Sequence, residues 1–235
     1  MKLAYLLVIL LFTLSACVKD TTANVRENNT PAVSVENKAV SAIKTEVKPS
    51  TERNALDDFP KYLAKNEGEL SELDFETAYE MCVRALTDYY KAVWNGSDIE
   101  LDAFVDSNNL KQYKQLKIQS QYDLHSNLTN NSVQDIEIGA WEVEYIDDMD
   151  GGYLYLSLPV EIKKSLGSNG EVTEFLVRNL NGKLVIVDWY TGTKDSYDFL
   201  VRGENLTIDN PNIWNDSELV KKLNSKQIEF SGSTR

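Results

Sequence analysis

The hydrophobic residues of this chain change their spacing once, close to Asn130-Asn131, and that change limits the folds open to the sequence. Before this point, apolar residues recur every three or four positions, which is the period of an amphipathic helix. After it, they alternate with polar residues over about sixty positions, as in half-buried strands. We therefore expect helices first and antiparallel strands second, which is the order of an α+β domain.

The helical half predicts three helices. The strongest begins after Ser71 and Asp74, which can cap it, and ends before Gly96. Its apolar stripe consists of Phe75, Ala78, Tyr79, Cys82, Leu86, Tyr89, Tyr90, Val93 and Trp94. A short helix is expected over Asp98–Val105, and a third over Leu110 to about His125.

The strand half opens with two long strands. The first is expected from Ile136 to Tyr145, and its alternation slips by one position next to Gly139, which predicts a β-bulge. The second, Tyr153–Ile162, alternates cleanly. The face of this strand that is expected to be buried consists of Leu154, Leu156, Leu158, Val160 and Ile162.

Two further strands, Val172–Leu180 and Lys183–Tyr190, are joined by Asn181-Gly182, a strong hairpin signal. The last strand is apolar on both faces, with Trp189 on the same face as Val185 and Val187, and this predicts a central position in the sheet. The remainder, Thr191–Arg235, predicts an irregular extension with one short helical stretch near Ser217–Leu223.

This order of elements resembles the NTF2-like, or cystatin-like, α+β cone over about residues 73–190. The elements that carry the resemblance are the long helix ending in Trp94-Asn95-Gly96, two further helices and long antiparallel strands with a bulge. The resemblance implies three N-terminal helices packed on a curved antiparallel sheet, with a pocket at the open end of the cone. Because the family includes binding proteins, scaffolds and a few enzymes, it selects no single function.

The first sixteen residues have the pattern of an export signal. Lys2 precedes an apolar run, Leu3–Leu14, and the small residues Ser15 and Ala16 follow. A helix of about 12 residues covers only about 18 Å of a hydrocarbon core about 30 Å thick. The run is therefore too short to remain as a membrane-spanning helix.

Leu14-Ser15-Ala16-Cys17 resembles the lipobox of bacterial lipoproteins. The resemblance implies that the Cys17 thiol receives lipid and that the signal is cut before this residue. Residues 1–16 would be the signal peptide, residues 17–55 the lipid anchor with a polar, disordered linker, and residues 56–235 the folded domain. Such a protein is exported and anchored to the outer face of the cytoplasmic membrane, or to an outer-membrane leaflet.

The charge of the chain restricts its partners. The net charge is −13, and from Ser71 to Arg235 there are 15 Lys and Arg against 28 Asp and Glu. An acidic surface repels phosphate backbones and anionic lipid headgroups, so nucleic acid is not an expected partner. Contact with the membrane is expected through the lipid on Cys17 alone.

Few residues could perform chemistry. Cys82 lies on the apolar stripe of a helix and is expected to be a buried, unreactive thiol. His125 is the only histidine, so neither a histidine metal cluster nor a histidine relay can form, and no metal or cofactor is expected. The acidic turn Asp147–Asp150 fits a calcium loop poorly and is interpreted as a solvated hairpin turn.

The densest aromatic and acidic cluster supplies the pocket candidates, which are Asp188, Trp189, Tyr190, Tyr197 and Asp198. Three interpretations remain open: core packing with turn capping, a ligand or partner groove, and an Asp/Tyr acid–base pair like that of ketosteroid-isomerase-like members of the fold. We expect a non-catalytic cell-envelope module that binds a protein, a peptide or a small ligand. The alternative is a small enzyme using an Asp/Tyr pair in the cone pocket.

Overall fold

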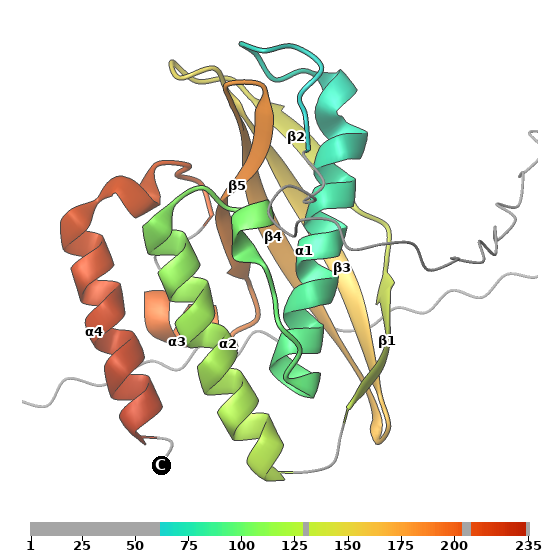
Figure 1. Ribbon diagram of the computed structural model, residues 1–235, viewed down its shortest axis with the longest axis vertical. Helices are drawn as coiled ribbons and strands as arrows, with labels where there is room; N and C mark the ends of the chain where they lie inside the picture. The colour runs from blue at the N-terminus through green and yellow to red at the C-terminus, as the bar shows by residue number, and fades with distance from the viewer. Residues whose placement is uncertain (1–61, 129–131, 204–207, 234–235) are drawn as a thin grey trace, which may run out of the picture. The chain divides into compact units, whose positions relative to one another are not determined.

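A curved antiparallel sheet covered by helices forms the α+β domain in the computed structural model, which describes residues 62–128, 132–203 and 208–233 (Figure 1). The expected signal peptide, Cys17 and the linker lie outside these residues. Within the described ranges, no helix combines the length and the apolar character needed to cross a membrane.

Helix α1 (Phe75–Asn95) confirms the strongest helical prediction. It follows the 3-10 turn η1 (Glu72–Asp74), where the Asp74 carboxylate accepts hydrogen bonds from the backbone N–H and the hydroxyl of Ser71, at 2.9 and 3.0 Å. Gly96 ends the helix with a φ of 67°, a left-handed conformation that glycine adopts without steric cost.

Helix α2 (Asn108–Leu128) confirms the third predicted helix, whereas the prediction of a short helix over Asp98–Val105 was wrong. Only the 3-10 turn η2 (Leu101–Ala103) forms in its place. The two residues that follow run beside the sheet instead, and the Phe104 carbonyl accepts a hydrogen bond of 2.8 Å from the backbone N–H of Ile186. The Phe104 carbonyl therefore pairs with the sheet instead of forming a hydrogen bond within a helix, so a tertiary contact outweighs the local helical propensity.

The five described strands are antiparallel and pair in the order β1-β3-β4-β5, with β2 also on β3. Their bounds are β1 (Val133–Ile138), β2 (Glu142–Ile146), β3 (Tyr153–Lys164), β4 (Gly167–Leu180) and β5 (Lys183–Thr191). Strand β4 begins five residues before the predicted start at Val172. That first part is polar and therefore lacks a hydrophobic signal, but it pairs with the end of β3.

The predicted slip near Gly139 is confirmed as a break that divides one edge strand into β1 and β2. Ile138 pairs with Val160 and Glu142 with Ser157, so three residues of the edge strand face two residues of β3. One residue is therefore extra, as in a bulge.

The predicted central position of β5 was wrong, because β5 is the last strand in the sheet order. Its free edge is nevertheless covered, since Leu184 and Ile186 donate backbone hydrogen bonds to the carbonyls of Tyr62 and Phe104, at 2.7 and 2.8 Å. The faces of this edge strand are buried separately, one by the main core and the other by Arg202 and Trp214, which bind Asp188. A shift of register next to Val187 also places Trp189 in the main core with Leu184 and Ile186, contrary to the predicted alternation.

The helical stretch predicted near Ser217–Leu223 is confirmed, but the helix continues to Ser233, and the prediction that the rest of the C-terminal region is irregular was wrong. This region contains α3 (Tyr197–Arg202), the 3-10 turn η3 (Ile213–Asn215) and α4 (Ser217–Ser233), which packs against α2 and α3. Helices therefore precede and follow the sheet, rather than forming one N-terminal group of three. Polar Gln227 interrupts the stripe of α4, but it is buried and its side chain donates hydrogen bonds to the Tyr113 carbonyl and the Tyr197 hydroxyl.

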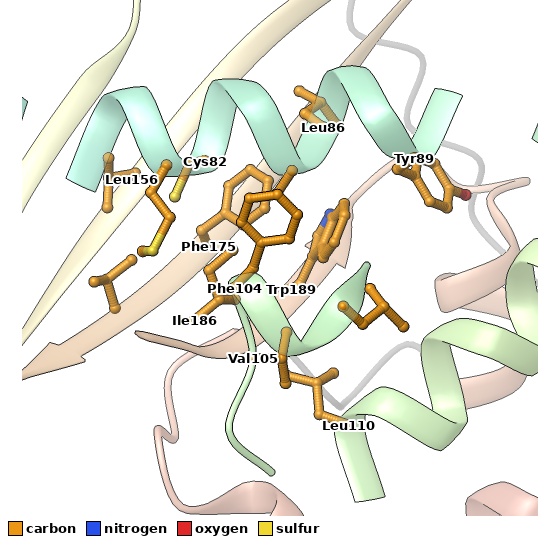
Figure 2. Close-up of a cluster of buried hydrophobic side chains, with 14 of the residues drawn as sticks. Cys82, Leu86, Tyr89, Phe104, Val105, Leu110, Leu156, Phe175, Ile186 and Trp189 are labelled. Carbon is orange, nitrogen blue, oxygen red and sulfur yellow. The ribbon is translucent and has the colours of Figure 1, made fainter. Parts of the chain in front are cut away.

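The main core lies between α1 and the sheet (Figure 2). Cys82, Leu86 and Tyr89 of α1 belong to the same buried cluster as Phe175 and Trp189, and the Tyr89 and Trp189 ring centroids are 5.4 Å apart. The predicted inward face of β3 is confirmed, because all of its members are buried: Leu154, Leu156, Leu158, Val160 and Ile162. Cys82 is a buried free thiol, as expected, and burial raises its pKa. A smaller cluster, formed by Tyr153, Leu176, Tyr190 and Ile208, is separate from this core.

Substitutions in α4 test whether this helix belongs to the domain. Leu223 is 1% exposed and Ile228 is 70% exposed on the same helix. Leu223→Ala is expected to lower the free energy of unfolding by about 2–5 kcal/mol, because it leaves a cavity between α4 and its neighbours. Ile228→Ala is the matched control and should change it by less than about 0.5 kcal/mol. Chemical denaturation measures both values, and equal effects would show that α4 does not pack on the domain.

Candidate functional site

A cavity of about 390 Å³ lies between α1, α2, the ends of β3 and β4, and the connection from β5 to α3. We call it the α1–α2 pocket. Its lining residues are Tyr89, Tyr90, Val93, Trp94, Lys117, Gln121, Leu124, His125, Lys164, Asn169, Glu171, Thr191, Thr193, Asp195, Ser196 and Tyr197. Aromatic rings and polar groups thus line the same cavity, as they do in many small-molecule sites.

A carboxylate lies at the centre of the hydrogen bonding in this pocket. Glu171 accepts one bond from the Tyr90 hydroxyl and one from the Asn169 side-chain amide, both at 3.1 Å. The Tyr89 hydroxyl donates to the side-chain carbonyl of Gln121 on the facing helix. Burial and then the neighbouring Glu171 raise the pKa of Tyr90 well above its ordinary value, so this phenol keeps its proton at neutral pH.

One corner of the pocket is a stack of aromatic and cationic groups. The His125 ring lies on the Trp94 indole with 3.7 Å between centroids, and the Lys164 ammonium lies 4.1 Å from the same indole ring. Burial and the nearby Lys164 lower the pKa of His125, which is therefore neutral at neutral pH. His125 lies in the last turn of α2, the helix-end position expected from the sequence.

Behind the pocket, the buried side chain of Asp198 accepts three hydrogen bonds. The donors are the Tyr113 hydroxyl at 2.8 Å, the Lys117 ammonium at 2.8 Å and the Thr191 backbone N–H at 2.9 Å. Burial alone would raise the pKa of Asp198, but the ammonium groups of Lys114 and Lys117 outweigh it and hold the pKa well below the ordinary value. Asp198 is therefore a fully engaged carboxylate and a poor proton acceptor.

Lys114 is the unsatisfied member of this cluster. Its side chain is fully buried, and its ammonium has no hydrogen-bond acceptor, although it lies 3.6 Å from the Asp198 carboxylate and 4.7 Å from the centroid of the Trp189 ring. Burial lowers the pKa of Lys114 well below its ordinary value, against the opposing attraction of Asp198. One more turn along α2, Lys117 has the close contact that Lys114 lacks.

A second buried ion pair joins β5 to the C-terminal region. Arg202 donates two hydrogen bonds to the Asp188 carboxylate, at 3.0 and 2.9 Å, and the Trp214 indole N–H adds a third at 2.9 Å. The guanidinium also lies 4.9 Å from the centroid of the Tyr190 ring. Asp188 is thus committed to holding α3 and η3 against the sheet.

The five residues predicted for the pocket do not share one cavity. Tyr197 lines the α1–α2 pocket, Asp198 lies directly behind it, and Trp189 is buried in the main core. Asp188 and Tyr190 contact Arg202. The structure therefore brings the two carboxylates next to cations rather than next to an open space.

Sequence reasoning missed the residues that face the pocket from α2 and from the hairpin of β3 and β4. These are Lys117, Gln121, Lys164, Asn169 and Glu171. One signal was available for Lys117: it lies at helical spacing from apolar Tyr113 and therefore on the inner face of α2. The hairpin residues gave no signal, because the polar stretch around Asn169 reads as an exposed turn.

The acidic turn between β2 and β3 is occupied by a side chain of the protein itself. Arg178 forms ion pairs with Asp148 and with Asp150, while Asp148 accepts the backbone N–H groups of Asp150 and Gly152 at 2.9 Å. Among the residues that the structure describes, no group of three or more His, Cys, Asp or Glu side chains is placed to hold a metal ion.

Another hollow, of about 500 Å³, runs along β1, β3 and β4, where Gly139 and Gly170 lack side chains. Its polar side chains are the glutamates of the strands and Thr193, so the Thr193 hydroxyl is its one side-chain donor, whereas the α1–α2 pocket has side-chain donors and acceptors on several elements. The α1–α2 pocket is therefore the candidate site. Comparison with protein-family models, curated proteins and solved structures found no match to this chain.

Lys114 and Lys117 provide a matched pair for testing the buried cluster. Lys117→Met leaves Asp198 without its close cation and should lower the free energy of unfolding by about 3–5 kcal/mol. Lys114→Met removes a buried ammonium that has no hydrogen-bond acceptor but also a cation 3.6 Å from Asp198, and these effects oppose each other, so it should change the free energy of unfolding by less than about 1 kcal/mol. Chemical denaturation at neutral pH measures both changes. Equal losses in the two variants would contradict the distinction drawn between these lysines.

The pH dependence of stability provides an independent readout for Lys114. Its pKa is lower in the folded protein than the value of about 10.4 in the unfolded chain. Between these two values the unfolded chain binds more protons, so the free energy of unfolding must rise with pH. Wild type should therefore gain stability relative to Lys114→Met as the pH is raised through this window.

Proposed function

We propose that this chain is an exported cell-envelope lipoprotein whose domain binds a small polar molecule in the α1–α2 pocket without transforming it. The proposal that the domain binds a small molecule rests on the pocket itself. In it, aromatic rings and hydrogen-bonding groups from four parts of the fold line one cavity of about 390 Å³. A small ligand is favoured over a protein or peptide because the polar groups converge inside a cavity.

The proposed anchor rests on the sequence Leu14-Ser15-Ala16-Cys17 and the apolar run before it. Each buried methylene of an attached lipid contributes about 0.8 kcal/mol, so two or three acyl chains give stable attachment. The acidic charge of the chain favours attachment through this lipid rather than through the protein surface, and it disfavours nucleic acid as a partner.

We include an NTF2-like cone in the proposal. Its support is the curved sheet with the long helix α1 lying against it (Figure 1), together with a pocket lined in part by the C-terminal half of that helix. The C-terminal helices α3 and α4 are additions to the arrangement that this resemblance implies.

A small enzyme that pairs Asp188 or Asp198 with a tyrosine has less support. Neither carboxylate lines the pocket, and both are buried against cations. The Tyr113 hydroxyl already donates to Asp198, whose pKa is far below that of a general base suited to neutral pH.

Fatty-acid labelling tests the anchor. Bacterial cells that express the chain are fed a clickable fatty acid, and the purified protein is analysed for the label. Wild type should carry label and sediment with membranes, whereas Cys17→Ser should carry none, because it lacks the thiol that accepts the lipid. The control is Cys82→Ser, which removes the only other cysteine and should remain labelled. Equal label in wild type and Cys17→Ser would overturn the proposed anchor.

A further inference from the structure

Charged side chains of both signs line the α1–α2 pocket. Two carboxylates, Glu171 and Asp195, and two ammonium groups, Lys117 and Lys164, belong to its lining. Lys117 is already paired with Asp198 behind the wall. A ligand with a strong charge of either sign would meet a like charge within the same cavity, so the arrangement favours a neutral molecule.

The hydrogen-bonding groups of the wall need both donors and acceptors from a ligand. The side-chain carbonyl of Asn169 is buried and has no partner, while the nitrogen of the same amide donates to Glu171. Gln121 on α2 accepts from Tyr89 through its carbonyl, which leaves its amide nitrogen as a donor in the lining of the same cavity. An unpartnered buried acceptor costs about 1–3 kcal/mol, and a ligand hydroxyl recovers this cost once the Asn169 side chain turns its covered carbonyl oxygen towards the cavity.

Apolar surface fills the space between these polar groups. The rings of Tyr90 and Tyr197 and the side chains of Val93 and Leu124 line the same cavity. A fatty acid would satisfy this surface but would leave the amide groups of the wall unpaired. A cavity of about 390 Å³ is large enough for roughly one or two sugar rings.

From these three features we infer that the α1–α2 pocket binds a neutral saccharide, an inference that rests on the proposed binding function. A sugar ring has hydroxyl groups that donate and accept at its edge, and C–H groups on its faces that pack against aromatic rings. The ring edge lies between Asn169 on β4 and Gln121 on α2, and its faces contact the tyrosine side of the pocket.

Binding measurements on the mature, lipidated chain test this inference. The protein is purified in a detergent without a sugar headgroup and titrated with N-acetylglucosamine, chitobiose and maltose by calorimetry and saturation-transfer NMR. At least one of these sugars should bind saturably. Asn169→Ala and Gln121→Ala should each raise its Kd by about tenfold or more, because each removes a hydrogen-bonding partner.

The control variant is Gln112→Ala, which changes an exposed glutamine of the same helix outside the pocket lining and should leave Kd unchanged. Two further probes are octanoate and alanyl-alanine, which represent apolar anions and zwitterions. If only one of these binds, and Asn169→Ala and Gln121→Ala weaken it, the saccharide inference is wrong although the pocket binds ligands. If no probe binds, or if a sugar binds equally to all variants, the saccharide inference is overturned. Circular dichroism verifies that each variant is folded.

Discussion

The buried carboxylate of Asp198 is the interaction on which the arrangement of the helices depends. It joins three elements: α2 through Tyr113 and Lys117, β5 through the backbone N–H of Thr191, and α3, to which it belongs. Removing a carboxylate from water is costly, and only several charge-assisted hydrogen bonds compensate for that cost. This requirement fixes the helices relative to the sheet edge more strictly than apolar contacts alone, which tolerate sliding.

The same interaction shapes the pocket. Lys117 lies between Asp198 and the cavity, with its ammonium 5.0 Å from the centroid of the Tyr89 ring, and Tyr197 next to Asp198 forms part of the wall. On the other side of β5, the Asp188 carboxylate forms an ion pair with Arg202 and accepts a hydrogen bond from Trp214. Both sides of this strand therefore contact the C-terminal region. The polar residues that most resemble catalytic groups in the sequence therefore support the site from behind.

Local pattern was sufficient to predict much of this fold. The stripe of α1, the inward leucines of β3 and the slip at Gly139 are properties of neighbouring residues, and the structure confirms all three. What could not be predicted depends on distant partners. The helix expected after Ser97 gave way to pairing with β5, and α4 is held by Gln227, whose partners Tyr113 and Tyr197 are remote in sequence. The pocket could not be predicted for the same reason, because its lining residues on the helices and on the hairpin of β3 and β4 lie far apart in the sequence.

Amide hydrogen exchange at Thr191 tests the central role of Asp198 most directly, because this N–H donates to that carboxylate. Asp198→Asn removes the negative charge and places an amide donor among existing donors, and exposed Asp195→Asn serves as the control. Exchange at Thr191 and across α3 is expected to become about tenfold faster or more in Asp198→Asn only, while β3 and β4 keep their protection. Equal exchange at Thr191 in wild type and Asp198→Asn would contradict the account.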